Sequence, residues 1–391
     1  MRKVIRFASI FFLIIVASIL IFSFSDKYKI GVIKNNIECT VIAKCNDDAR
    51  AIDVIDNSIY VAYPHSVKVI SQDGRVKKLF DVDENIDDIV CLSDRIYVIS
   101  DSSIYEYNNS KVNVLLSNIP SGNNDIKHKI LVCGDKILFT VPAKTNSGVY
   151  DDNSLEKIAT FEDEAIGTAS VYSVNVGTRK IELYAMGIRG IKGIDISSEG
   201  KIYAIFSGMN NKGVRPVCND TDYIYEIKEK KNYGWPNYSG GDQIDSSRFA
   251  RDKLIEFIGE HKVIDMDKPV FVANSLGELE ELGVYKWNKI LPKDSIIYVN
   301  TLKNEIEAIV NKKYKISLLR LIDKSNIKDI TVKEDKIILL DSGANAIYSI
   351  NSKNDFSKGK VSIEILVYLF ILVLAIIMII MFKKRKADEN E

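Results

Sequence analysis

The chain has 391 residues, and its 53 basic and 53 acidic side chains give a formal net charge of zero at pH 7. Proteins that bind nucleic acid carry a basic face, so this composition argues against a nucleic-acid partner. The five cysteines are too few and too scattered for a disulfide framework, and no spacing among them is typical of a zinc site. We expect them to be buried small residues, although Cys39 and Cys45 could bridge a short loop.

Two long apolar runs lie near the ends of the chain. Residues 7–25 follow three basic residues, and residues 365–382 precede the basic run of residues 383–386. A membrane span needs about 20 apolar residues and at least about 17, so both runs qualify. Because positive charge flanks the outer end of each run, the positive-inside rule places both termini in the cytoplasm and the middle of the chain outside.

The first run could instead be a cleaved signal peptide. Its apolar stretch is longer than the roughly 7–15 residues of a signal core, and no small-residue cleavage site follows it, which favours an uncleaved anchor. The predicted organisation is therefore a stub and anchor over residues 1–25, an extracytoplasmic domain over 26–360, and a second span with a short basic tail over 361–391. Transporters usually carry ionisable residues within their membrane spans. These two apolar runs carry none, so we expect them to serve only as anchors.

A hairpin pattern recurs through the middle of the chain. Each copy has a short apolar strand, a turn with Asp, Asn, Ser or Gly, and a second strand rich in Ile, Tyr and Val. Copies begin at Ala51, Asp88, Lys129, Gly193 and Asp329, and Asp294 begins a half copy. The first three copies lie about 40 residues apart, the length of one four-stranded propeller blade. An all-β, six-bladed β-propeller is the predicted fold.

The spacing is irregular in two places. The interval from Ile137 to Ile202 is longer than one blade, which indicates an insertion or an extended loop. Between Ile202 and Ile297 there is room for a missed blade plus a long loop. Residues 210–270 are rich in charges and show no clear hairpin, so we expect them to form excursions over one face of the propeller. Loops on a rigid repeat scaffold are where binding function usually lies.

The residues from Asn232 to Pro236 read Asn-Tyr-Gly-Trp-Pro. Pro236 has no N–H and biases Trp235 away from helical angles, so this run predicts a shaped loop. Bulky aromatic rings held in such a loop either fill a core or line a site.

Five short pieces, in order, carry a resemblance to a known family. They are Gly187–Arg189, Gly193–Asp195, Gly213–Val217, Tyr223–Ile227 and Tyr233–Pro236. Together they make the chain similar to the glucose/sorbosone dehydrogenases, six-bladed β-propellers that use pyrroloquinoline quinone. The resemblance implies this quinone and Ca²⁺ as cofactors if the chain is an enzyme of that kind. A fold persists more readily than its chemistry, so each implied site residue needs separate scrutiny.

The resemblance implies a catalytic His just before the third hairpin. Asp125 or Ile126 falls at that position here, and His128 follows two or three residues later. Either His128 acts from a shifted register or it is an edge polar residue, and Asp125 could serve as a base if burial raised its pKa. Arg189 matches the family arginine at the reacting centre, or it forms an ion pair within its loop.

Several implied cofactor contacts are replaced. The Asn-Pro pair that follows the family arginine is Gly190-Ile191 here, and the arginine-bearing segment before the last blade offers only Lys324 and Lys328. A lysine is a poor substitute for a guanidinium fork on a carboxylate-rich quinone. The candidate cofactor-binding residues are therefore Arg215, Lys324 and Lys328.

Two further sets of candidates complete the implied site. Asp220 and Asp222 could supply hard oxygen ligands for Ca²⁺, or they could be turn formers. The aromatic residues Tyr233, Trp235 and Tyr238 could form a platform for a sugar ring, or they could plug the central channel of the propeller.

Three functions follow from these observations. The first is a membrane-anchored propeller that binds a carbohydrate or another cell-envelope ligand and has lost oxidoreductase chemistry. The second is an active quinone-dependent aldose dehydrogenase with substituted contacts. The third is a scaffold that presents its face to another envelope protein. The replaced cofactor contacts favour the first, and the retained Arg189 favours the second.

Overall fold

The computed structural model describes residues 30–92, 95–122, 125–249, 255–258 and 266–353, and residues 30–352 form one compact unit. In the part that is described, every regular element is a β-strand. No helix within it is long and apolar enough to cross a membrane. The predicted spans over residues 7–25 and 365–382 lie outside the described residues, as do the ends of the predicted extracytoplasmic domain.

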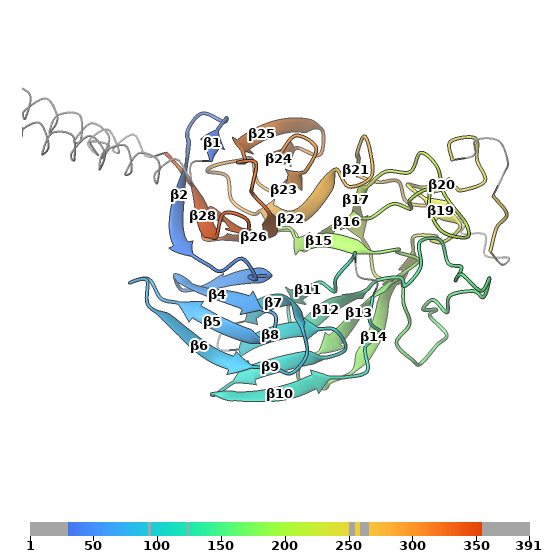
Figure 1. Ribbon diagram of the computed structural model, residues 1–391, viewed down its shortest axis with the longest axis horizontal. Coiled ribbons are helices and arrows are strands. Elements are labelled where there is room, and N and C mark those ends of the chain that lie inside the picture. The colour runs from blue at the N-terminus through green and yellow to red at the C-terminus, as the bar shows by residue number, and fades with distance from the viewer. Residues whose placement is uncertain (1–29, 93–94, 123–124, 250–254, 259–265, 354–391) are drawn as a thin grey trace, which may run out of the picture. The chain divides into compact units, whose positions relative to one another are not determined.

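Six sheets of four or five strands form the blades of the unit, which confirms the predicted six-bladed propeller (Figure 1). The strands of blade one are β3 (Ala51–Ile55), β4 (Ser58–Tyr63), β5 (Ser66–Ile70) and β6 (Val76–Asp81). Those of blade two are β7 (Ile86–Leu92), β8 (Arg95–Ser100), β9 (Ile104–Asn108) and β10 (Lys111–Leu116).

Blades three and four carry the longer connections. Blade three contains β11 (Ile130–Cys133), β12 (Lys136–Val141), β13 (Ser170–Asn175) and β14 (Ile181–Met186), with β18 (Lys231–Asn232) added in parallel to β14. Blade four contains β15 (Ile191–Ile196), β16 (Ile202–Phe206), β17 (Tyr223–Ile227) and β21 (Phe271–Val272). A small separate hairpin consists of β19 (Tyr238–Ser239) and β20 (Asp242–Gln243).

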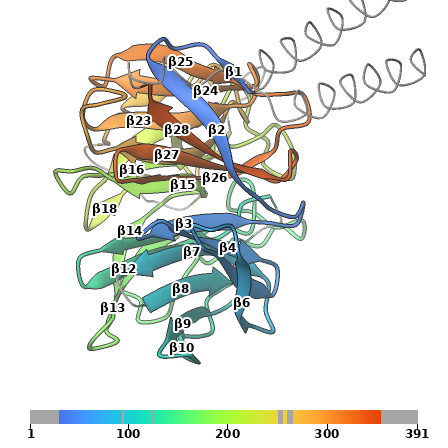
Figure 2. The same cartoon turned by 90° about the vertical axis from the view of Figure 1, so that its left-hand side faces the viewer.

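Blades five and six include the first strands of the unit. Blade five contains β22 (Leu279–Tyr285), β23 (Ser295–Asn300), β24 (Glu305–Val310) and β25 (Tyr314–Arg320), with β1 (Gly31–Val32) on its outer edge. Blade six contains β26 (Ile327–Lys333), β27 (Lys336–Asp341), β28 (Ala346–Ser352) and β2 (Ile37–Lys44). Strand β2 lies beside β28 with Ile37 opposite Ser352, so an early strand completes the last sheet and closes the ring (Figure 2).

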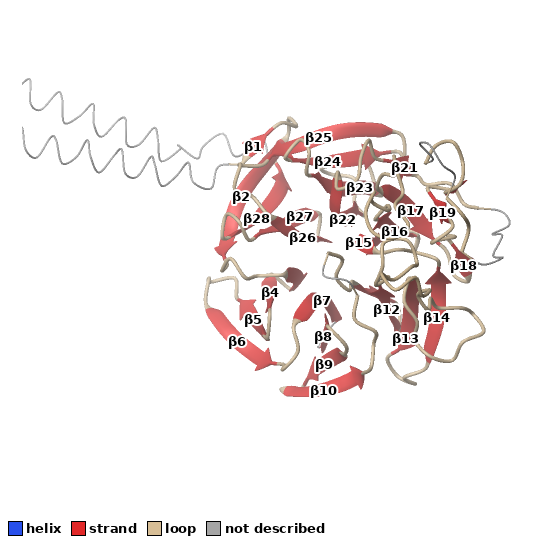
Figure 3. Cartoon of the chain, turned by 45° about the vertical axis from the view of Figure 1, so that its right-hand side comes forward, coloured by secondary structure: helices blue, strands red, loops and turns tan. Residues whose placement is uncertain are grey.

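The innermost strands of the six blades contact one another in sequence around the channel, and β26 contacts β3 to complete the circle (Figure 3). Apolar side chains fill the space between neighbouring sheets. Between blades three and four, for example, Leu138, Ala185, Ile202 and Tyr225 belong to one buried cluster. Burial of both sheet faces explains why the inner strands are rich in Ile and Val.

Tight turns explain why the recurring pattern forms hairpins. Asp56 and Asn57, between β3 and β4, both have positive φ angles of 46° and 62°, as a two-residue type I′ turn requires. Asn109 and Ser110 have the same backbone between β9 and β10. The predicted hairpin copies at Ala51, Asp88, Lys129, Gly193 and Asp329 are all present.

The expectation for residues 210–270 was wrong in part. Residues 223–227 form β17, a regular strand in the sheet of blade four. The long interval between Ile202 and Ile297 contains the rest of blade four and the first strand of blade five, and no additional blade lies among its described residues. The half copy at Asp294 is the second strand of blade five, whose first strand was hidden by a bulge between Glu280 and Leu282.

Candidate binding site at the mouth of the central channel

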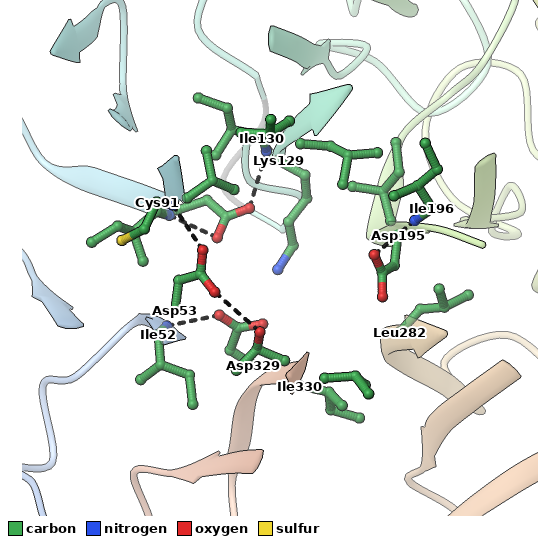
Figure 4. A pocket seen from close by; sticks show the side chains of 18 of the residues that line it. Ile52, Asp53, Cys91, Lys129, Ile130, Asp195, Ile196, Leu282, Asp329 and Ile330 are labelled. Atoms are coloured by element: carbon green, nitrogen blue, oxygen red, sulfur yellow. Dashed lines mark hydrogen bonds between the residues drawn. The ribbon is translucent and has the colours of Figure 1, made fainter. Parts of the chain in front are cut away.

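All six innermost strands line a polar cavity of about 130 Å³ in the channel. Carboxylates from several blades face it, and Figure 4 shows Asp53, Asp195 and Asp329 pointing inward together with the ammonium group of Lys129. Polar groups buried in this way require hydrogen-bond partners, because an unpaired buried charge is costly.

Those partners are backbone amides of the neighbouring blade. Asp53 of blade one accepts from Cys91 N at 2.7 Å, Asp88 of blade two from Ile130 N at 3.0 Å, and Asp195 of blade four from Val284 N at 2.7 Å. Asp329 of blade six accepts from Ile52 N of blade one at 2.7 Å (Figure 4). Four of the six blade junctions are therefore joined by a carboxylate, and these aspartates serve the architecture.

A larger pocket of about 420 Å³ lies at one end of the channel, where the innermost strands begin; we call it the mouth pocket. Its volume falls within the range typical of small-molecule sites, about 300–1,000 Å³. Six carboxylates and five cations line it. The acidic residues are Asp47, Asp48, Asp87, Asp125, Glu280 and Glu281, and the basic ones are Arg50, Lys127, Lys129, Lys192 and Lys328.

Most of these cations already have partners. Lys192 Nζ lies 2.8 Å from Glu280 Oε1 and 3.2 Å from Asp222 Oδ2. Lys127 Nζ lies 3.7 Å from Asp87 Oδ1. Lys328, at the start of β26, pairs with no carboxylate among the described residues. The pocket thus presents both hydrogen-bond donors and acceptors, with no excess of positive charge.

The strongest ion pair of the pocket crosses from blade three to blade five. Lys129 Nζ donates to both carboxylate oxygens of Glu281, at 2.9 and 2.7 Å. Burial lowers the pKa of Lys129, but the Glu281 and Asp88 carboxylates outweigh it and raise that pKa, so Lys129 stays charged. Burial raises the pKa of Glu281 to about 7, against the attraction of Lys129. Burial likewise raises the pKa of Asp329, beneath the pair, well above its usual value.

Comparison with known proteins decides the family. Residues 102–342 match the family described as Glucose / Sorbosone dehydrogenase, which is more than half of the chain. The chain belongs to the glucose/sorbosone dehydrogenase family. Among curated protein sequences, none matches it significantly.

Solved structures agree with this family in fold. The calcium structure of a carbohydrate-active enzyme of family AA12 from Trichoderma reesei superposes with a TM-score of 0.64 at 12% identity, covering 83% of this chain and 98% of that one. The holo form of the pyranose dehydrogenase PQQ domain from Coprinopsis cinerea gives 0.61 at 11% identity, covering 83% and 97%. The PQQ-bound aldose sugar dehydrogenase from Streptomyces coelicolor gives 0.57 at 12% identity, covering 81% and 99%. Identities this low establish the fold alone.

The two candidates for the family's base lie in different surroundings. Asp125 is exposed and lines the mouth pocket. His128 does not line it and is only 2% exposed. Its Nδ1 donates to Thr140 O at 2.7 Å, and its Nε2 is buried without a hydrogen-bond partner in the described part of the chain. Of the two, only Asp125 can meet a ligand in this pocket.

Arg189 is buried and does not line the mouth pocket. Its guanidinium donates to Ser207 Oγ at 2.8 Å and to Gly208 O at 3.0 Å. Burial lowers the pKa of Arg189, and the nearby carboxylates, Asp125 among them, oppose that shift. The family arginine position therefore lies close enough to Asp125 for their charges to interact, although the side chain makes structural contacts.

Asp220 and Asp222 do not present free oxygens to a metal. Asp220 accepts from Met209 N at 2.6 Å, Thr221 N at 2.8 Å and Ser239 Oγ at 2.8 Å. Asp222 accepts from Gly277 N at 2.8 Å and from Lys192 Nζ at 3.2 Å. A carboxylate whose lone pairs already receive N–H and O–H donors does not fit Ca²⁺ coordination. Within the described residues, no group of three or more acidic, His or Cys side chains could hold a metal ion.

The candidates for holding the quinone are scattered. Arg215 is buried and donates to Glu256 O at 2.7 Å and Pro236 O at 3.0 Å, and burial lowers its pKa to about 10. It joins loops and does not line the mouth pocket. Lys328 lines that pocket, whereas the exposed Lys324 does not. A multiply anionic quinone needs several unpaired cations at one place, so these residues do not fit it.

The three aromatic candidates are buried away from both cavities of the channel. Tyr233 packs edge-on against Phe206 and Tyr225 between blades three and four, and its hydroxyl donates to Glu226 O at 2.8 Å. Trp235, 4% exposed, donates to Asn146 O at 3.2 Å. Tyr238 OH accepts from Gln243 Nε2 at 2.9 Å. They neither plug the channel nor form a shared platform in the mouth pocket.

Two residues that reasoning from the sequence missed are central to the site. Lys129 and Glu281 form the ion pair of the mouth pocket. A signal for Lys129 exists, because other hairpin copies have an inward Asp near the start of the inner strand and the third copy begins with Lys. Glu281 carries no such signal, since a bulge at that point breaks the alternation of β22. The five cysteines are free, so Cys39 and Cys45 form no bridge.

Proposed function

We propose that this glucose/sorbosone dehydrogenase homologue is a membrane-anchored, extracytoplasmic propeller that binds a carbohydrate or a related cell-envelope ligand in the mouth pocket and has lost quinone-dependent oxidation. The observation that carries the proposal is the charge balance of that pocket, where carboxylates and cations are nearly equal in number and most cations are already paired. Such a surface offers acceptors and donors for hydroxyl groups without attracting a strongly anionic cofactor.

Sugar hydroxyls suit this surface because each can donate to a carboxylate and accept from an ammonium group. Asp125 and Lys328 come from opposite sides of the ring, before β11 and at the start of β26, and both line the pocket. No aromatic side chain is among the lining residues of the described chain, so recognition relies on hydrogen bonds. Hydrogen-bond recognition discriminates strongly, since a mismatched ligand leaves buried polar groups unpaired.

The anchoring part of the proposal rests on the apolar runs at residues 7–25 and 365–382, each flanked by basic residues. It predicts that the full chain sediments with membranes and resists alkaline extraction. Protease added outside intact cells or protoplasts should remove the propeller. Release of the protein by alkaline carbonate would contradict the anchors.

One observation favours an active aldose dehydrogenase as the second candidate. Asp125 lies at the position of the family's base, lines the mouth pocket and interacts electrostatically with Arg189. An ionised Asp125 could accept a proton from a sugar hydroxyl, as general-base catalysis requires. Most of the cations that line the pocket with Asp125 are already paired with carboxylates and so are poorly placed to hold an anionic quinone, which is why binding without oxidation is favoured.

The test compares binding and turnover in the same purified full chain. Calorimetry with a panel of neutral sugars should show binding that Asp125→Asn weakens. Addition of the quinone and Ca²⁺ should give neither heat nor sugar-dependent dye reduction. Sugar-dependent reduction that Asp125→Asn abolishes would establish the dehydrogenase instead, and absence of any sugar binding would overturn the carbohydrate proposal. Glu182→Gln is the matched control, because Glu182 on β14 pairs with Lys136 on β12 and neither residue lines the mouth pocket.

A further inference from the structure

The mouth pocket and the channel cavity beneath it share two lining residues in the described chain, Lys129 and Glu281. These are the partners of the ion pair that crosses from blade three to blade five. The pair therefore separates the 420 Å³ pocket from the 130 Å³ cavity. Its members are not sealed away, because 11% of the Lys129 side chain and 14% of the Glu281 side chain remain exposed.

The backbone holds Glu281 in this place. Its φ angle is 42°, in the left-handed region that a non-glycine residue rarely adopts, and it forms the bulge between Glu280 and Leu282. On the neighbouring blade, a side chain at Gly193 would meet Leu282 N at 2.3 Å, so glycine is required there for the bulged strand to pack closely. A bulge re-aims a side chain out of the regular alternation, here towards the channel.

We propose that the Lys129–Glu281 pair is the specificity-determining floor of the mouth pocket: it contacts the innermost hydroxyl of a neutral sugar and excludes sugars that carry a charge at that point. This rests on the proposed function and adds a ligand class to it. A bound hydroxyl can donate to a Glu281 oxygen and accept the remaining N–H of Lys129. An additional carboxylate would repel Glu281, and an additional ammonium group would repel Lys129.

The proposal predicts opposite changes in two single variants. Glu281→Gln keeps the shape of the side chain but leaves Lys129 with unbalanced positive charge. Lys129→Met keeps the length of the side chain but removes the positive charge, so Glu281 is left as an acid that the ammonium group of a ligand can hold in its ionised form. We therefore expect Glu281→Gln to favour an anionic sugar and Lys129→Met to favour a cationic one, each by about tenfold relative to the neutral sugar, the ratio expected for one charge-assisted hydrogen bond.

The experiment titrates the full chain in detergent or nanodiscs with glucose, glucuronate and glucosamine. The wild type should prefer glucose, and the two variants should shift towards glucuronate and glucosamine respectively. General loss of folding cannot produce shifts of opposite sign. The charge-swapped double variant, Lys129→Glu with Glu281→Lys, should restore part of the preference for glucose. Glu182→Gln should leave the three affinities in their wild-type order.

The outcomes separate this inference from the proposed function. Wild-type binding of glucose with the same charge preference in both variants would refute the floor while leaving carbohydrate binding intact. If the wild type binds none of the three sugars, the proposed function fails. Amide hydrogen exchange then tests whether the Lys129–Glu281 pair separates the two cavities. In that measurement, faster exchange at Ile130 and Leu131 in Lys129→Met than in Glu182→Gln supports the partition, and unchanged exchange overturns it.

Discussion

The mouth pocket and the loop from Asn232 to Pro236 differ in how accessible their side chains are to a ligand. In the loop, which carries the clearest likeness to the family, Trp235 and Tyr233 are buried and their polar atoms are hydrogen-bonded. In the pocket, charged side chains such as Asp125 and Lys328 line open space. The aromatic side chains of the loop therefore hold the fold together, with Trp235 at the wall of a separate pocket of about 360 Å³. The mouth pocket instead presents charged side chains to a ligand, Asp125 at the position of the family's base among them.

The packing role of the loop is tested by truncating Trp235. Trp235→Ala should remove about 3–5 kcal/mol of unfolding free energy, because it leaves a large cavity among Ala143, Met209 and Phe249. Chemical denaturation monitored by circular dichroism measures the loss. Trp287→Ala is the control, since Trp287 is 36% exposed and should cost below about 1 kcal/mol. Equal losses in the two variants would mean that the loop is not a packing element.

A second test concerns Arg215, which joins three loops through backbone carbonyls. Its guanidinium donates to Glu256 O, Pro236 O and Ser147 O at 2.7, 3.0 and 3.3 Å. Arg215→Lys keeps the charge but cannot make the fork of bonds, so about 2–3 kcal/mol of unfolding free energy should be lost. The same change at the exposed Arg179 should have almost no effect. A loss of ligand affinity in Arg215→Lys without a loss of stability would instead give Arg215 the binding role first expected of it.

The third test uses pH and belongs to the mouth pocket. Burial raises the pKa of Glu281 to about 7 from an ordinary value of 4.5, so the folded state binds this proton more tightly than the unfolded state does. Its contribution to stability is present at low pH and is lost as pH rises from about 4.5 to about 7.

Glu281→Gln cannot release the proton, so its unfolding free energy should fall less over this window. Linkage gives a difference between the two proteins that changes by about 2–3 kcal/mol between pH 4.5 and pH 8. Urea titrations at several pH values measure it. Parallel pH profiles would show that Glu281 is ionised throughout.

The fold was predictable because its repeats are short and regular. Strands rich in β-branched residues and a turn such as Asp56-Asn57, whose backbone needs positive φ angles, identify each hairpin in the sequence. Strand β22 was missed where Glu281 interrupts the alternation, and β17 was missed because charged loops surround it. Local pattern therefore identifies a blade well, except where the chain departs from it to build the site.

The candidate site was much harder to predict, because it depends on contacts between blades. Asp220 and Asp222 have the composition of a metal site, but backbone amides from residues 209 and 277 occupy them. Lys129 and Glu281 are 152 residues apart in sequence and meet only when the ring closes. A single sequence contains no local signal for such a pair.

The smallest expected effect on stability comes from Lys328, and it tests whether the mouth pocket is a ligand surface at all. Lys328 lines the pocket without a carboxylate partner among the described residues, so Lys328→Ala should change the unfolding free energy by no more than about 0.5 kcal/mol. The affinity for a neutral sugar should nevertheless fall several-fold, because the ligand loses a charged donor. Calorimetry measures that affinity, and Lys324→Ala, on the loop before β26 and outside the pocket, is the control. Unchanged affinity in Lys328→Ala would mean that the ligand does not bind on the blade-six side of the mouth pocket. A loss of affinity in Lys328→Ala but not in Lys324→Ala would mean that an unpaired cation, and not the aromatic loop, is central to recognition.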